Sequence, residues 1–264
     1  MSALEGKIAV ITGGGRGIGK AIATTFSKEG AKLVLVSRTL RELQDTKKEL
    51  EKTGSSIAIM AGDISDEGFA NEIGEFVQKT FGAVDILVNA AGIYGPIGRV
   101  EDIDPNEWRK TLDINLTGTF LMVRTLLPFF KKSKRGKIIN FGGGGEGALP
   151  RFSAYVASKG GITRFTETVA AELKEFHIDI NAVLPGAVNT KFLDELLRAG
   201  VGSVGEEMYK KSLKQKEEGG VPPEKAARLA LFLASPQSDG LSGKTLSAVW
   251  DNYEDFPQYL DELM

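Results

Sequence analysis

The pair of residues best suited to do chemistry in this sequence is Tyr155 and Lys159, four positions apart in the stretch Ser153–Lys159. If the stretch is helical, the two side chains share one face. An ammonium beside a phenol favours the phenolate and lowers the phenol pKa from about 10 toward the working pH. Such a tyrosine can protonate a carbonyl that receives a hydride, or accept the proton in the reverse reaction. Alone, the spacing also fits a partly exposed helical pair, so its meaning depends on the rest of the chain.

A glycine-rich stretch, Thr12–Lys20, directly follows the first apolar run. Its spacing is Gly13-x-x-x-Gly17-x-Gly19 rather than the usual G-x-G-x-x-G. Glycines let the backbone turn sharply and approach a pyrophosphate, and the start of the following helix supplies free N–H groups and a positive dipole end. The sequence therefore predicts a dinucleotide site here. The residues expected to contact the nucleotide are Gly13, Gly15, Arg16, Gly17, Ile18 and Gly19.

The end of the second apolar run indicates which dinucleotide is bound. Sites for NAD usually place an acid about twenty residues beyond the glycine turn, where it binds the ribose 2′-hydroxyl. Here the run ends in Ser37 and Arg38, and no carboxylate appears before Glu42. Arg38, joined by Arg16, would suit a 2′-phosphate. We therefore expect NADP(H), with NAD as the alternative if both arginines are merely exposed.

Short apolar runs alternate with longer amphipathic stretches along nearly the whole chain. The predicted strands are 8–11, 33–36, 57–60, 86–88, 137–141 and 178–184, with a closing strand at 241–246. The predicted helices are 17–29, 40–52, 66–80, 105–132 and 153–176. This alternation requires crossover connections. It predicts an α/β fold with a doubly wound (Rossmann) parallel sheet of about seven strands and helices on both faces.

We expect residues 1–264 to form a single dinucleotide-binding domain, because no linker, repeat or low-complexity tract divides them. Residues 189–220 interrupt the alternation with a charged helical pattern after the sixth strand. We interpret this segment as a substrate flap, since ligands bind at the carboxyl edge of such sheets, although a plain surface excursion fits equally well. The tail, residues 248–264, interleaves aromatic and acidic residues. It would cover a neighbouring subunit or the site rim, or pack on its own domain.

Composition excludes several classes of function. The formal net charge is -2, so no global field recruits nucleic acid or anionic lipid. The sequence holds no cysteine and a single histidine, His177, which argues against thiol chemistry, a Ser-His-Asp triad and a metal site. No apolar run reaches membrane-spanning length, and the start lacks the form of a signal peptide. We expect a cytoplasmic protein that acts on a small molecule.

Several motifs together resemble the short-chain dehydrogenase/reductase family over essentially the whole chain. They occur in the family's order along the sequence. The pieces are Thr12–Gly19, Asp63-Ile64, Asn89-Ala90-Ala91-Gly92, Asn115, Tyr155-x-x-x-Lys159 and Pro185-Gly186-Ala187-Val188-Asn189-Thr190. Each piece alone is weak evidence, since Asn115 also fits a helix-interior polar residue and Pro185-Gly186 an ordinary turn. Their common order makes the resemblance specific.

The resemblance implies an oxidoreductase that transfers hydride between a nicotinamide and a ketone, secondary alcohol or 3-oxo substrate. It implies that Tyr155 donates the proton, that Lys159 holds the nicotinamide ribose, and that Asn115 anchors a water joining the lysine to solvent. The remaining cofactor contacts would be Asp63 and Ile64 at the adenine, Asn89, Ala90 and Gly92 along the groove, and Pro185, Gly186, Val188 and Thr190 at the nicotinamide. It also implies a homodimer or homotetramer formed by the helices near 105–132 and 153–176.

One departure concerns the catalytic serine, which the family places thirteen residues before the tyrosine, where its hydroxyl binds the substrate carbonyl. That position is Gly142 here, and the loop 140–146 contains no serine or threonine. Loss of such a donor costs about 100- to 1000-fold in rate. Three interpretations remain open. A substrate hydroxyl, a water or a backbone N–H of the glycine run replaces the serine hydroxyl in an active enzyme. Alternatively the enzyme is slow, or the protein binds the dinucleotide without catalysis. We favour an active or slowed enzyme, because Asn115, Tyr155 and Lys159 remain.

Overall fold

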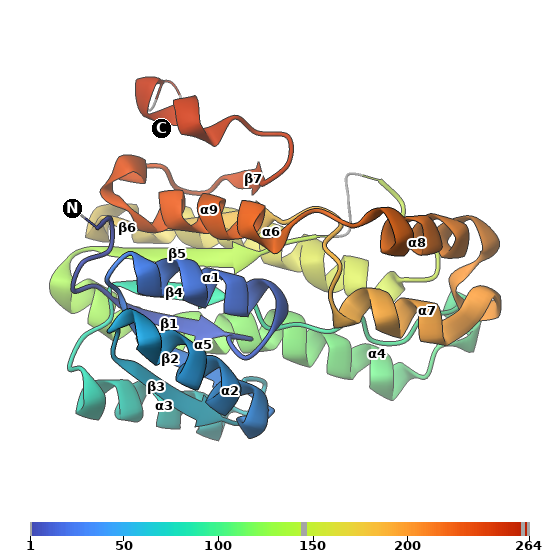
Figure 1. The fold of residues 1–264 in the computed structure, drawn as a ribbon, viewed down its shortest axis with the longest axis horizontal. Coiled ribbons are helices and arrows are strands. Elements are labelled where there is room, and N and C mark those ends of the chain that lie inside the picture. The colour runs from blue at the N-terminus through green and yellow to red at the C-terminus, as the bar shows by residue number, and fades with distance from the viewer. Residues whose placement is uncertain (1, 144–146, 260–261, 263–264) are drawn as a thin grey trace.

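The computed structural model describes residues 2–143, 147–259 and 262. Its described residues form a parallel sheet in the order β3-β2-β1-β4-β5-β6-β7 (Figure 1). The order reverses direction between β1 (Ile8–Thr12) and β4 (Ile86–Asn89), which pair directly. Ligands of open α/β sheets bind at the carboxyl ends of the strands beside such a reversal. The predicted doubly wound parallel fold is therefore confirmed.

The first six strands along the chain are the predicted apolar runs, because a sheet covered on both faces needs apolar side chains in both directions. The closing strand begins at residue 245, four residues later than the predicted range 241–246. The remaining strands are β2 (Lys32–Ser37), β3 (Ile57–Ala61), β5 (Gly136–Phe141), β6 (Ile178–Leu184) and β7 (Thr245–Ser247). Successive side chains point to opposite faces. Ala9 and Ile11 of β1 accordingly belong to one buried cluster, and Val10 belongs to another.

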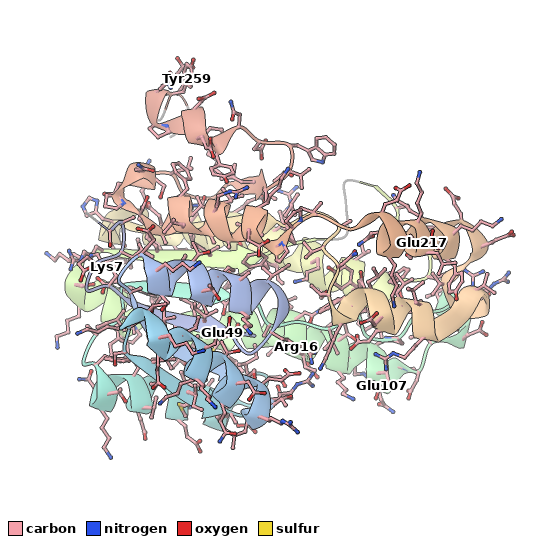
Figure 2. The ribbon with its side chains drawn as sticks, viewed as in Figure 1. Lys7, Arg16, Glu49, Glu107, Glu217 and Tyr259 are labelled. Atoms are coloured by element: carbon pink, nitrogen blue, oxygen red, sulfur yellow. The ribbon has the colours of Figure 1, made fainter. Side chains whose placement is uncertain are left out.

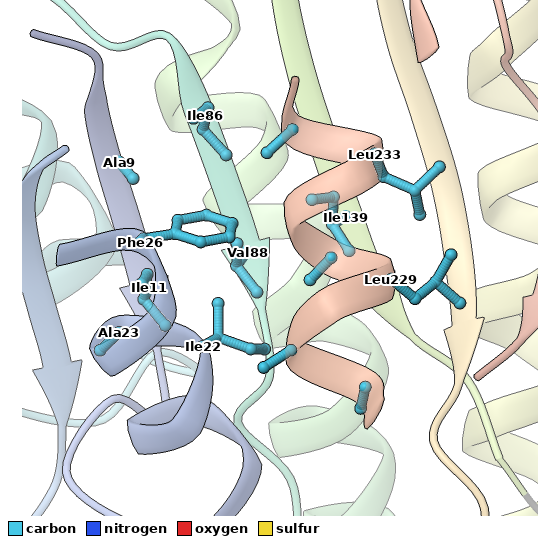
Figure 3. Close-up of a cluster of buried hydrophobic side chains, with 14 of the residues drawn as sticks. Ala9, Ile11, Ile22, Ala23, Phe26, Ile86, Val88, Ile139, Leu229 and Leu233 are labelled. Atoms are coloured by element: carbon cyan, nitrogen blue, oxygen red, sulfur yellow. The ribbon is translucent and has the colours of Figure 1, made fainter. Parts of the chain in front are cut away.

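One face of the sheet is covered by α1 (Gly17–Lys28), α2 (Leu40–Leu50) and α9 (Pro223–Ala234). Phe26 of α1 and Leu229 of α9 belong to the same buried cluster on this face (Figure 3). The other face is covered by α3 (Glu67–Thr80), α5 (Gly118–Ser133) and α6 (Ser153–Leu173), whose cluster includes the fully buried Phe130. Helix α9 was not predicted, although Pro223 at its start is a typical helix N1 residue.

The helix predicted over 105–132 is divided. It consists of α4 (Pro105–Leu112), a π-helical turn at Asp113–Thr117, and α5. π-Turns inside longer helices occur frequently at functional sites, because the extra residue redirects a side chain. Here the redirected residue is Asn115.

The predicted flap is a pair of helices, α7 (Lys191–Val204) and α8 (Glu206–Glu218), beyond the carboxyl ends of the strands (Figure 1). α7 is interrupted by the non-helical backbone of Gly200. After β7 the tail turns back toward α9, where Tyr253 and Phe256 lie 5.7 Å and 6.2 Å from the ring of Phe232. Within the described residues, no helix is both long and apolar enough to cross a membrane.

Candidate active site

A cavity of about 1430 Å³ lies along the carboxyl ends of the strands and reaches under the flap. Its wall is formed by segments distant in sequence, from the glycine turn to the start of the tail at Trp250 and Asp251. Pockets for drug-sized ligands measure about 300–1000 Å³. The cavity therefore has room for a dinucleotide together with a small substrate.

The glycine turn is built so that only glycine fits at its key positions. Gly13 has a φ of +69°, and a Cβ atom there would stand 3.0 Å from the backbone of Ala90. A Cβ atom on Gly19 would stand 2.2 Å from the carbonyl oxygen of Gly13. Helix α1 begins at Gly17 without a side-chain cap or an acid in its first turn. The free N–H groups and the positive dipole end at the start of α1 therefore favour binding of a pyrophosphate in the cavity.

The charged groups beside this turn form a small cluster. Arg16 Nη1 donates to Glu42 Oε1 at 3.1 Å, and Lys191 Nζ donates to the same oxygen at 2.7 Å. Burial tends to raise the pKa of Glu42, but the hydrogen bonds from Lys191 and Arg16 outweigh it and lower the pKa. Arg16 lies on the side of the turn that faces α7 (Figure 2). Arg38 also lines the cavity.

Tyr155 and Lys159 lie together on the cavity wall, from the first two turns of α6. Lys159 is only 5% exposed, and its Nζ donates to the carbonyl oxygen of Phe141 at 2.6 Å. The amine lies 5.9 Å from the centre of the Tyr155 ring. The two side chains thus share one face of the helix, as the sequence predicts.

The expected lowering of the Tyr155 pKa is wrong for this arrangement. Burial, followed by the neighbouring Tyr94 phenol, raises the pKa of Tyr155. Burial also lowers the pKa of Lys159 to about 8, because the interior disfavours the ammonium. The sequence shows which residues are neighbours but not how deeply they are buried. The phenol is therefore protonated at neutral pH, ready to donate a proton or a hydrogen bond.

Asn115 is fully buried and does not reach the cavity wall. Its Oδ1 accepts from Ile93 N at 2.8 Å, and its Nδ2 donates to Ile93 O at 2.9 Å and to Ser158 Oγ at 2.9 Å. These bonds tie the loop after β4 to the residue before Lys159. The side chain that the π-turn redirects thus fixes two parts of the site relative to each other.

The glycine that faces the tyrosine is Gly143, not Gly142. A Cβ atom on Gly142 would meet Leu184 Cδ2 at 3.0 Å and Thr163 Oγ1 at 3.6 Å, away from Tyr155. A Cβ atom on Gly143 would stand 2.7 Å from the Tyr155 hydroxyl, and its φ of +151° is rarely adopted by residues with a side chain. A side chain at Gly142, the position expected for the serine, would thus point away from Tyr155, whereas Gly143 lies against the phenol. The rest of the glycine run, residues 144–146, lies outside the described residues.

An aromatic cluster that the sequence did not predict surrounds the phenol of Tyr155. Tyr94, in the loop after β4, stands edge-to-face to Tyr155, with ring centroids 4.8 Å apart. Phe192 of α7 and Phe152, just before α6, lie 4.7 Å and 5.4 Å from the Tyr94 ring. Tyr94 lies two residues after the motif 89–92, and this position in the loop that follows a central strand is the signal that could have identified it.

Most of the predicted cofactor and catalytic residues meet at this one cavity. Those that line it are Gly13, Arg16, Gly17, Ile18, Gly19, Ser37, Arg38, Asp63, Ile64, Ala90, Gly92, Tyr155, Lys159, Pro185, Gly186, Val188 and Thr190. Gly15, Asn89 and Asn115 lie behind the wall. Gly15 packs against Glu42, and Asn89 donates to Asn140 Oδ1 at 3.0 Å. These residues support the wall instead of forming it.

The chain is similar to known dehydrogenases and oxidoreductases over most of its length. The family model for short chain dehydrogenases matches residues 7–199. A 2,3-dihydro-2,3-dihydroxybenzoate dehydrogenase of Bacillus subtilis (strain 168) is 32% identical over 243 residues, which cover 89% of this chain and 91% of the relative. An uncharacterized oxidoreductase of the same organism is 31% identical over 250 residues, covering 94% of this chain and 91% of the relative.

Solved structures of a reductase and a dehydrogenase have the same fold as this chain. The crystal structure of levodione reductase superimposes with a TM-score of 0.85 at 26% identity, covering 95% of this chain and 98% of that chain. NAD+-bound xylitol dehydrogenase gives a TM-score of 0.85 at 25% identity, covering 92% of this chain and 98% of that chain.

Proposed function

The chain belongs to the short-chain dehydrogenase family, and from that premise we propose that it is an NADP(H)-dependent oxidoreductase acting on a ketone or secondary alcohol, 3-oxo compounds included. The observation that carries the proposal is the placement of Tyr155 and Lys159 on the wall of the same cavity as the glycine turn. The relatives support an oxidoreductase that uses a nicotinamide dinucleotide.

The residues present fit a dinucleotide. The uncapped start of α1 and the glycine backbone would hold its phosphates, and Pro185, Gly186, Val188 and Thr190 would frame its nicotinamide. When bound in its reduced form, the nicotinamide supplies a hydride. Lys159 would hold the adjoining ribose, since its amine lies in the wall between Phe141 and the cavity.

In the reducing direction the carbonyl carbon of the substrate gains the hydride and its C=O π bond breaks. The oxygen takes the proton from the Tyr155 hydroxyl, which leaves an alcohol and a phenolate. Lys159 provides a positive charge beside that phenolate. Asn115 is a positioning residue, because its bonds to Ile93 and Ser158 fix the segments that carry Tyr94 and Lys159.

NADP(H) preference is supported by the excess of positive side chains at the expected adenosine end. Arg16, Arg38 and Lys191 line the cavity there, against the two carboxylates of Glu42 and Asp63. A 2′-phosphate would compete with Glu42 for Arg16 and would bind Arg38 without such competition. The NAD-bound neighbours make NAD the alternative cofactor.

We further propose that residues 1–264 act as one domain, with 189–220 as its substrate flap. Thr190, Phe192 and Met208 of the flap contribute to the cavity wall, whereas the sheet supplies the glycine turn. Homo-oligomerisation is proposed from the exposed Phe120 of α5, which stands edge-to-face to Phe165 of α6. The two rings form a contiguous apolar surface across the two helices, and contiguous apolar patches are candidate interfaces.

The second candidate function is a weakened or non-catalytic dinucleotide-binding protein, which the glycines at 142 and 143 favour. The deciding experiment incubates the protein with NADPH and a broad panel of ketones and 3-oxo compounds, and follows loss of the reduced nicotinamide absorbance. We expect substrate-dependent oxidation of NADPH. Tight NADPH binding with no oxidation by any panel member would instead favour the non-catalytic candidate.

A further inference from the structure

The reacting oxygen of a substrate in this site would find no side-chain donor at Gly142 or Gly143, the first two residues after β5. Gly142 and Gly143, the described residues of that loop nearest to Tyr155, have no side chain, and Gly143 lies against the tyrosine hydroxyl. A Ser hydroxyl at Gly143 would need both a change of its φ of +151° and a shift of Tyr155. The donor is therefore to be sought on another part of the wall.

Tyr94 is the other phenol on that wall. It lines the cavity, and its ring stands edge-to-face to the Tyr155 ring with centroids 4.8 Å apart and an interplanar angle of 72°. The two phenol groups are close enough that Tyr94, after burial, contributes to raising the pKa of Tyr155. The loop that carries Tyr94 is held by both bonds of Asn115 to Ile93. Tyr94 is thus a fixed neighbour of the proton donor.

Tyr94 also has the protonation state that a donor needs. Burial, and then the negative charge of Glu195, raises the pKa of Tyr94. Its hydroxyl is therefore neutral at physiological pH and above, so it can donate a hydrogen bond without giving up its proton. A donor of this kind stabilises charge that develops on an oxygen most effectively where water is excluded.

The two phenols are surrounded by aromatic rings and aliphatic side chains. Phe152 and Phe192 stand edge-to-face to Tyr94, and Leu149, Leu196 and Met208 complete this part of the wall. Phe152 and Leu196 are buried, and Tyr94, Leu149 and Met208 pack against them in the same hydrophobic cluster. Such a slot suits a flat, uncharged ring and disfavours a carboxylate or a phosphate.

We propose that Tyr94 replaces the missing loop hydroxyl: its phenol donates a hydrogen bond to the reacting oxygen of a ring ketone that lies against Phe152 and Phe192, while Tyr155 transfers the proton. Tyr94 keeps its own proton throughout. The inference rests on the proposed carbonyl reduction and adds to it a second catalytic residue and a substrate class, uncharged cyclic ketones.

The test compares wild type with Tyr94→Phe, which keeps the ring contacts and removes only the hydroxyl. Tyr209→Phe is the matched control, because Tyr209 packs in the same apolar cluster but is absent from the described cavity wall. Substrates are pairs with equal numbers of carbons, cyclohexanone with 2-hexanone and 2-tetralone with 2-decanone. NADPH affinity is measured separately by titration, and folding by thermal unfolding.

We expect Tyr94→Phe to lower kcat/KM for the ring ketones about 100-fold or more. NADPH affinity and unfolding temperature should stay unchanged, and Tyr209→Phe should match wild type. Wild type should prefer each ring ketone over its open-chain partner. If wild type is active and Tyr94→Phe equals it, or if the open-chain ketones are preferred, this inference is overturned and the proposed function stands. If wild type binds NADPH and reduces no ketone, both are overturned.

Discussion

Gly143 faces the Tyr155 hydroxyl so closely that a Cβ atom on this glycine would stand 2.7 Å from the phenol oxygen. The contact explains why the loop after β5 carries glycine at this point. It also shows that a loop hydroxyl cannot be restored by a simple substitution, because both the space and the backbone φ of +151° oppose a side chain.

Gly143→Ser is predicted to lower kcat/KM at least about 10-fold and to destabilise the protein by about 1–3 kcal/mol, the usual cost of a strained backbone position. Gly142→Ser should give no gain in turnover, since its side chain would point toward Leu184 and Thr163. The measurements are steady-state kinetics and chemical denaturation. Gly147→Ser is the control, because a Cβ atom there meets no atom within 4 Å. A tenfold gain in turnover from Gly142→Ser would contradict this account.

Arg38→Asp is predicted to weaken NADPH binding about 10- to 100-fold and to leave NADH binding unchanged or improved. A charge-assisted hydrogen bond to a phosphate contributes about 1.5–3 kcal/mol, and the new carboxylate would repel the phosphate. Arg41→Asp makes the same charge change at an exposed position of α2 that is not part of the described cavity wall. The measurement is nucleotide titration with both dinucleotides. An unchanged preference in Arg38→Asp would remove the basis for NADP(H) specificity.

The buried amine of Lys159 predicts a specific pH dependence of stability. Its pKa is lowered to about 8 from 10.5, so between these values the unfolded chain binds more protons than the folded one. The free energy of unfolding should therefore rise with pH across this window, by up to about 3 kcal/mol from this group. Below pH 8 the contribution is constant.

Lys159→Met is the variant that isolates this effect. The free energy of unfolding of wild type minus that of Lys159→Met should increase from pH 8 to pH 10, as measured by urea denaturation. A difference that stays constant with pH, or that decreases, would show that Lys159 is not buried as described.

Asn115→Ala is predicted to lower the free energy of unfolding by about 2 kcal/mol or more, because it leaves the backbone N–H and C=O of Ile93 without their partners. It should also lower kcat more than NADPH affinity, since Ile93 precedes Tyr94 and Ser158 precedes Lys159. Asn106→Ala, on the exposed surface of α4, should stay within about 0.5 kcal/mol of wild type. Equal effects of the two substitutions would refute the positioning role.

The sequence was sufficient for the parts of the structure that depend on local pattern. Apolar runs predicted β1 to β6, because a strand covered on both faces must be apolar throughout. The glycine spacing predicted a phosphate-binding turn, since the positive φ of Gly13 and the close approach at Gly19 exclude other residues. The order of the motifs predicted which residues would meet, although Asn89 and Asn115 lie behind the cavity wall.

The features that were missed depend on tertiary contacts. The π-turn at Asp113–Thr117 places Asn115 on Ile93, a contact that no helical period reveals. The residue that faces Tyr155 is set by the path of the chain after Phe141, which a count of residues does not reveal. The pKa of Tyr155 depends on burial by an aromatic cluster whose members come from separate segments. Sequence spacing contains none of this information.

The most direct test of the central claim is turnover by Tyr155→Phe, measured together with its affinity for NADPH. The account predicts that ketone reduction falls at least about 100-fold, the usual contribution of a positioned acid. The dissociation constant for NADPH should stay within a few fold of the wild-type value. Ketone reduction at the wild-type rate by Tyr155→Phe, or a wild-type protein that binds neither NADPH nor NADH, would contradict it.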